Sequence, residues 1–259
     1  MREHSKKVNV LGIDVAVMRP DKAVNLSMDY MRRKGLQTVF FLSAESSLYC
    51  QSEPWAAELL QSCPLILTGD RYMELAVRHQ HNDSIKDSGI GEFADEYLKR
   101  FLHKLNKENR EIFAVMEKQE HMDSLEEYLH DSYPDIYVKG IVFSGETKGE
   151  ADKVINEINA YIPDIVFFCL PVHQQMMFLK KYSAMINARL CICIESIQPL
   201  IRKETEEPPS LMRMLHLDHL WYHAKKDSLI KKTIVGSIFK KKVLDDSSAS
   251  GTEREEQEK

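Results

Sequence analysis

Short apolar runs alternate along the chain with longer stretches in which apolar residues recur every three or four positions. An unbroken apolar run predicts a strand covered on both faces, and helical spacing predicts an amphipathic helix. The predicted strands are Thr38–Leu42, Pro64–Thr68, Ile112–Val115, Ile136–Ile141, Ile165–Leu170 and Leu190–Ile194. The predicted helices are Pro20–Lys34, the segment after Pro54, Asp123–Ser132, Glu150–Tyr161 and Gln174–Ile186. This alternation predicts an α/β fold with a mainly parallel sheet and flanking helices.

Two short segments refine this pattern. Val8–Val17 predicts a strand or a hairpin with a turn near Gly12, and the small polar residues of Ser43–Ser47 suit the start of a helix. The strand Ile165–Leu170 is followed at once by Pro171. Ligands of parallel sheets bind beyond the carboxyl ends of the strands, so we expect a binding loop to begin there.

The pattern changes towards the C-terminus. Arg202–Ser210 is polar and rich in proline, and Leu211–Leu244 carries eight Lys or Arg, interleaved with apolar residues, against two Asp and no Glu. We expect an α/β domain over residues 1–205, a basic amphipathic appendage over 206–244 and a disordered tail over 245–259. The appendage is either a surface for anionic lipid headgroups or a helix whose apolar face packs on the core.

Composition narrows the class of protein. The 259 residues are 43% hydrophobic, which suffices for one substantial core, and the net charge of −5 argues against general binding of nucleic acid. The charged N-terminus lacks the apolar stretch of a signal peptide, and no run approaches the roughly 20 apolar residues of a spanning helix. A cytoplasmic protein is expected, with its five cysteines reduced and mostly in the core.

Several segments, in their order and spacing, resemble the WecG/TagA/CpsF glycosyltransferases. These are VNVLGIDVAV near the start, SEPWAAELLQSCPLIL from Ser52, LEEYLHDSYPDIYVKG from Leu125, VINEINAYIPDIVFFCLPVHQQ from Val154 and EPPSLMRMLHLDHLWYH from Glu207. The resemblance implies a Rossmann-like fold and the transfer, without a metal and with inversion, of an N-acetylmannosamine-like sugar. The implied donor is a UDP-sugar and the implied acceptor a polyprenyl-diphosphate-linked sugar at the inner face of the membrane.

The same resemblance implies site residues on the first half of the sheet. The T-x-N of the family appears here as Phe41-Leu42-Ser43, and its P-D-G, whose Asp is the proposed general base, as Thr68-Gly69-Asp70. We therefore expect Asp70 to take the acceptor's proton, and Ser43 and Thr68 to contact substrate. The alternative for Asp70 is a purely structural cap of the helix that follows.

Further candidates follow the later strands. The G-x-G-x-P-x-Q-E of the family keeps its glutamine as Gln175, and V-G-G-x-F-D becomes Ile194–Pro199, with Glu195 in place of a glycine. The cations expected to hold a diphosphate are Arg71, Arg202 and Arg213. The chain has no D-x-D metal motif, so neither a metal nor another cofactor is expected.

One departure from the family pattern leaves two hypotheses open. The glycine-rich G-G-x-x-G becomes Met116-Glu117-Lys118-Gln119-Glu120, which brings carboxylates to a loop that should approach a diphosphate. The chain is either a divergent transferase or a non-catalytic relative that binds protein or membrane in polysaccharide assembly. An enzyme should bring Asp70 and Gln175 together at an open pocket, whereas a degenerate relative should fill that space with Phe41, Met116 and Met176.

Overall fold

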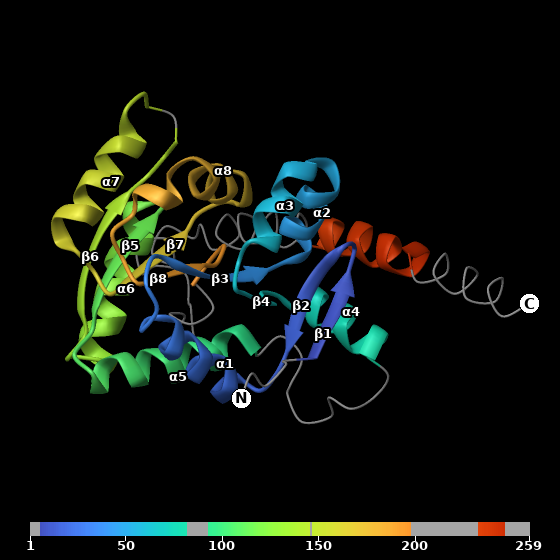
Figure 1. Ribbon diagram of the computed structural model, residues 1–259, viewed down its shortest axis with the longest axis horizontal. Coiled ribbons are helices and arrows are strands. Elements are labelled where there is room, and N and C mark those ends of the chain that lie inside the picture. The colour runs from blue at the N-terminus through green and yellow to red at the C-terminus, as the bar shows by residue number, and fades with distance from the viewer. Residues whose placement is uncertain (1–5, 82–92, 146, 198–232, 247–259) are drawn as a thin grey trace, which may run out of the picture. The chain divides into compact units, whose positions relative to one another are not determined.

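The computed structural model describes residues 6–81, 93–145, 147–197 and 233–246 (Figure 1). The chain divides into two compact units, Met1–Ile201 and Arg202–Lys259. Of the second unit, the described part is a helix over residues 233–246.

The first unit is built on a parallel sheet, which has six strands within the described residues, in the order β4-β3-β8-β7-β5-β6. All neighbouring pairs are parallel. The strands are β3 (Gln37–Leu42), β4 (Leu65–Thr68), β5 (Glu111–Met116), β6 (Tyr137–Val142), β7 (Ile165–Cys169) and β8 (Leu190–Cys193). Every residue of β4, β7 and β8 is buried, as the apolar runs of these strands predict.

Helices cover both faces of this sheet (Figure 1). On one face lie α1 (Pro20–Tyr30), α5 (Phe93–Lys107) and α6 (Gln119–Ser132), which share one buried cluster. Four more helices lie between strands: α2 (Ala44–Ser52), α3 (Pro54–Gln61), α7 (Glu150–Tyr161) and α8 (Val172–Tyr182), the last continued by a 3₁₀ turn, Ser183–Met185. The helix that follows β5, α6, lies on the first face, whereas α8, which follows β7, packs with α2 and α3 on the other face. The connections after β5 and β7 therefore run over opposite faces of the sheet, and the topological switch point lies between these two strands.

A two-stranded hairpin and one helix flank the β4 edge. The strands β1 (Lys6–Val10) and β2 (Ile13–Val17) are antiparallel, and the turn between them uses Leu11 and Gly12, both with positive φ. β2 packs beside β4, and α4 (Arg71–His81) contacts β1 and β4. The predicted hairpin is confirmed.

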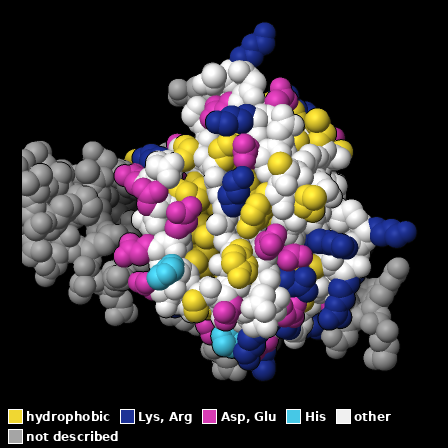
Figure 2. Space-filling model, turned by 90° about the vertical axis from the view of Figure 1, so that its left-hand side faces the viewer, with side chains coloured by type: hydrophobic (Ala, Val, Ile, Leu, Met, Phe, Trp, Pro, Cys, Tyr) yellow, Lys and Arg dark blue, Asp and Glu magenta, His cyan; other side chains and the backbone are white. Residues whose placement is uncertain are grey.

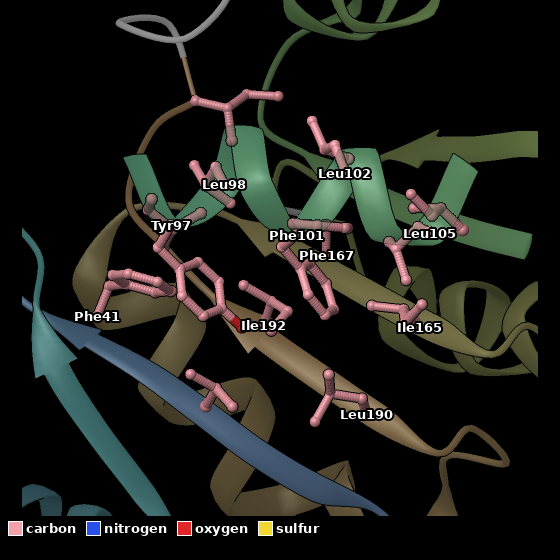
Figure 3. Close-up of a cluster of buried hydrophobic side chains, with 14 of the residues drawn as sticks. Phe41, Tyr97, Leu98, Phe101, Leu102, Leu105, Ile165, Phe167, Leu190 and Ile192 are labelled. Carbon is pink, nitrogen blue, oxygen red and sulfur yellow. The ribbon is translucent and has the colours of Figure 1, made fainter. Parts of the chain in front are cut away.

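Helix α5 dominates the core on its face of the sheet. Figure 3 shows its apolar side chains directed at β7 and β8, with Phe101 between Ile192 and Ile165. Tyr97 is fully buried, its ring lies 5.1 Å from that of Phe41, and its hydroxyl donates to Ser27 Oγ at 2.7 Å. Burial raises the pKa of Tyr97, so the phenol is neutral and its hydrogen bond ties α5 to α1.

The predicted α/β class and Rossmann-like architecture are confirmed, and the differences lie in particular helices. α5 is not among the helices predicted from the sequence. α6 begins at Gln119, four residues earlier than predicted, and α8 begins at Val172, two residues earlier. α1 ends at Tyr30, before the predicted Lys34, because the chain tightens there into a turn in which the Arg32 and Arg33 amides donate to carbonyls three residues back.

The side of the first unit formed by β6 and its neighbours carries mixed charge. Figure 2 shows acidic and basic side chains interspersed there, with hydrophobic side chains between them. Lys139 on β6 pairs with Glu157 on α7 at 3.0 Å, and both side chains are about half exposed. Such exposed pairs contribute little to stability. This face offers no single-sign surface.

Helix 233–246 in the second unit is amphipathic. Gly236, Phe239 and Val243 share one buried face, while Ile234 and Ile238 are about half exposed. Lys240, Lys241 and Lys242 are exposed. The helix includes Asp245 and Asp246, which were predicted to belong to the tail.

Candidate functional site

Ser43 lies at the carboxyl end of β3 and caps α2. Its hydroxyl accepts from the Ser46 amide at 3.0 Å, and its own amide donates to Ser46 Oγ at 2.7 Å, which completes a reciprocal capping box. The Ser43 side chain is buried. Its position at a strand end is therefore fixed by local sequence.

Asp70 is held by two helices. Its Oδ1 accepts from the Met73 amide at 2.8 Å, so Asp70 caps α4, and its Oδ2 accepts from the Ala44 amide at 2.8 Å, at the start of α2. Two helix N-termini thus face one carboxylate and stabilise its negative charge. The structural alternative for Asp70 is observed, while its catalytic role stays a prediction.

Glu195 lies just beyond β8, beside Ser43. The register pairs Phe40 of β3 with Cys193 of β8, so the residues that follow leave neighbouring strands at the same level. The Ser43 hydroxyl donates to Glu195 Oε1. Because Asp70 holds Ala44 and Glu195 holds Ser43, two carboxylates flank the start of α2.

Gln175 spans the ends of two strands from the first turn of α8. Its Nε2 donates to the carbonyls of Phe168 at 2.8 Å and Ile194 at 3.2 Å, and the residue is 1% exposed. Within the described part of the chain its Oε1 is buried without a hydrogen-bond partner. Gln175 thus fixes the backbone that leads into Glu195.

Thr68 and Gly69 connect β4 to Asp70. A Cβ added to Gly69 would lie 2.8 Å from the Phe41 carbonyl oxygen, so glycine is needed for the close approach of the two backbones. Thr68 is buried and lines a small cavity of about 50 Å³ together with Glu74. Glu74, which is not among the residues predicted for the site, is a buried carboxylate, and its Oε1 accepts from the Phe93 amide at 3.1 Å.

The signal that marks Glu74 is its place in the helical pattern. The buried residues Met73 and Val77 lie beside it on α4, so a carboxylate at this position faces the core rather than water.

The side chains expected to fill the strand ends in a degenerate relative are all buried. Phe41 and Met116 belong to the cluster beneath α1, α5 and α6, and Met116 is the last residue of β5. Met176 is fully buried next to Gln175 on α8. The polar residues Ser43, Asp70 and Glu195 lie just beyond β3, β4 and β8.

The segment in place of the glycine-rich loop is short. β5 ends at Met116 and α6 begins at Gln119, so Glu117 and Lys118 alone connect them. Glu117, Lys118 and Glu120 are exposed, and Lys118 lies 3.9 Å from Glu120. The connection after β5 therefore carries both acidic and basic side chains, next to the topological switch point between β5 and β7.

Of the three arginines expected to hold a diphosphate, the structure describes one. Arg71 is the first residue of α4, next to Asp70, and is exposed. Arg202 and Arg213 lie outside the described residues. Among the described residues, no group of three or more His, Cys, Asp or Glu is arranged to hold a metal ion, and no helix is long and apolar enough to cross a membrane.

Other cavities lie away from the strand ends. One of about 410 Å³ opens between the hairpin and the start of β4, lined by residues that include Asn9, Asp14 and Tyr30. The five cysteines are unpaired, and all but Cys63 are buried. Burial raises the pKa of Cys50, Cys63 and Cys169 to about 12, so these thiols are poor nucleophiles.

Comparison with known proteins gives the same family as the sequence segments. No curated protein matches the chain significantly. The family model described as glycosyl transferase WecG/TagA/CpsF family matches residues 8–239, which is most of the chain. The chain therefore belongs to the WecG/TagA/CpsF family of glycosyl transferases.

Proposed function

We propose that the protein transfers a sugar from a UDP-sugar donor to a lipid-linked sugar acceptor during synthesis of a surface polysaccharide or teichoic acid. The proposal is carried by one observation: a chain of a glycosyltransferase family gathers Ser43, Asp70 and Glu195 at adjoining strand ends. Parallel sheets bind ligands at this edge. The sugar is proposed to be N-acetylmannosamine-like, and the acceptor to carry a polyprenyl diphosphate.

The proposed chemistry is an inverting displacement without a metal. An acceptor hydroxyl attacks the anomeric carbon while a carboxylate removes its proton, and UDP leaves from the opposite side. Asp70 and Glu195 are carboxylates that lie just beyond β4 and β8. The family pattern favours Asp70 as the base.

The remaining site residues are proposed to bind substrate. Ser43, Thr68 and Gln175 contact the sugars, and Arg71, with Arg202 and Arg213, neutralises the diphosphate and the charge that develops on departing UDP. Arg71 supports this role by its place beside Asp70 on an exposed helix start.

The second unit is proposed to hold the enzyme at the cytoplasmic face of the membrane. Helix 233–246 supports this by exposing Lys240, Lys241 and Lys242 together with Ile234 and Ile238. Basic residues attract anionic headgroups and exposed apolar residues enter the interface.

A non-catalytic role in polysaccharide assembly is the second candidate, and the connection after β5 favours it. Glu117 and Glu120 are exposed where a diphosphate would be approached by glycines in the family pattern. Carboxylates there repel a phosphate.

A transfer assay separates the two candidates. The full chain is incubated with UDP-N-acetylhexosamines and a lipid-diphosphate-linked sugar, and the lipid product is detected by mass spectrometry. A transferase yields an acceptor heavier by one sugar together with free UDP. An unchanged acceptor with every donor, at enzyme concentrations equal to the acceptor, contradicts the proposal.

A further inference from the structure

The two carboxylates that flank the start of α2 differ in what holds them. Asp70 is fixed through both oxygens, each accepting from a main-chain amide at 2.8 Å. Those amides belong to the first turns of α2 and α4, so two helix dipoles add to the stabilisation of the charge. A carboxylate stabilised in this way is a weak proton acceptor.

Glu195 is held through a hydroxyl. The Ser43 Oγ donates to Glu195 Oε1, which is the interaction that an acceptor hydroxyl must make with a general base. Ser43 is itself fixed by the capping box with Ser46, so the carboxylate is oriented by a rigid partner.

The backbone that carries Glu195 is also fixed. Gln175 Nε2 donates to the carbonyl of Ile194, the residue before Glu195, and to that of Phe168 on the neighbouring strand. Gln175 is buried, so these hydrogen bonds are shielded from water. The carboxylate is thus presented from a central strand rather than from a loose loop.

We propose that Glu195, rather than Asp70, is the general base of this transferase, with Ser43 as its positioning residue. The inference rests on the proposed transferase function. In the step, the acceptor O–H bond breaks and its proton passes to the Glu195 carboxylate. The acceptor oxygen bonds to the anomeric carbon, and the bond from that carbon to UDP breaks, its electron pair leaving on the phosphate oxygen.

Three variants test the assignment: Glu195→Gln, Asp70→Asn and Ser43→Ala. For each, kcat and KM are measured against pH, and the Kd of the donor is measured by calorimetry. Glu195→Gln should lower kcat about 100-fold or more, leave the donor Kd unchanged and abolish the acidic limb of the pH profile. Ser43→Ala should move that limb to higher pH, because the carboxylate loses a donor to its charged form.

The competing carboxylate gives the contrasting result. Asp70→Asn should lower kcat less than Glu195→Gln and keep the acidic limb, while it lowers the stability of the fold. If Asp70→Asn abolishes the limb and Glu195→Gln keeps it, the assignment of Glu195 is wrong and the transferase function stands. If the wild-type chain neither transfers sugar nor binds UDP, the proposed function fails, and the assignment fails with it.

Discussion

At the residue scale, the site consists of side chains that serve the fold and the proposed chemistry together. Ser43 caps α2 and donates to Glu195, and Asp70 caps α4 while it holds the first amide of α2. The resemblance to the family predicted these positions, since each follows an apolar strand. It did not predict the Ser43–Glu195 contact, because that depends on β3 and β8 being neighbours although about 150 positions separate them in sequence.

Loss of the Asp70 side chain should destabilise the fold whether or not it takes part in chemistry. Asp70→Ala removes the acceptor for Ala44 N and Met73 N, and we expect the free energy of unfolding to fall by about 1–2 kcal/mol in urea denaturation. Asp29→Ala is the control, because Asp29 is exposed and pairs with Arg32 on the surface. Equal effects of the two substitutions would contradict the capping role.

A second prediction concerns the turn before α7. Burial tends to raise the pKa of Glu150, but hydrogen bonds from Ser144, Thr147 and Gly145 outweigh it, so the pKa lies below its ordinary value of 4.5. A carboxyl whose pKa is lowered by folding stabilises the fold above its unfolded pKa, and this contribution is lost as the pH falls through the folded pKa.

Glu150→Gln should therefore lower the free energy of unfolding at neutral pH and have a much smaller effect in acid, at about pH 3. Urea denaturation at both values measures the difference, with the exposed Glu126→Gln as control. An effect of Glu150→Gln that is independent of pH would contradict the account of this turn.

At the element scale, unbroken apolar runs predicted the strands well, and helix α5 was missed. Its buried residues recur at helical spacing, so the signal was present: Phe93, Tyr97, Leu98, Phe101, Leu102 and Leu105. These apolar residues are interspersed with charged residues, and the helix follows a polar connector in the sequence. Both features make its helical spacing harder to recognise. The early start of α6 was also missed, because Glu117–Glu120 was compared with a glycine-rich loop rather than with a helix start.

The docking of α5 on α1 can be tested through one buried hydrogen bond. Tyr97→Phe leaves Ser27 Oγ without its phenolic donor, and we expect a loss of about 1 kcal/mol in the free energy of unfolding. Ser27→Ala and the double variant complete the cycle. A coupling energy near zero would show that the contact does not join the two helices.

At the scale of the whole molecule, sequence periodicity predicted an α/β sheet with a basic C-terminal segment, and the strand order came from the structure. Nothing in the runs themselves places β8 between β3 and β7. That order brings Ser43, Glu195 and Gln175 to one edge. The role of the second unit stays a prediction, supported by the exposed lysines of helix 233–246.

Membrane attachment should depend on those lysines. Replacing Lys240, Lys241 and Lys242 by Gln should weaken binding to phosphatidylserine vesicles about 100-fold, because each lysine contributes about 1 kcal/mol near an anionic surface. Sedimentation with vesicles measures the loss. The control replaces three exposed lysines of the first unit, Lys34, Lys99 and Lys107. If the helix variant binds vesicles as tightly as the wild type, the proposed role of these lysines in membrane attachment is wrong.

The proposed function requires that the strand-end site accept a nucleotide-sugar. Calorimetric titration of the full chain with UDP and UDP-N-acetylhexosamines tests this claim, with ADP as the control nucleotide and Arg213→Ala as the matched variant. We expect saturable binding of UDP that Arg213→Ala weakens and ADP does not reproduce. The absence of a binding heat at millimolar UDP would contradict the claim and favour a non-catalytic role.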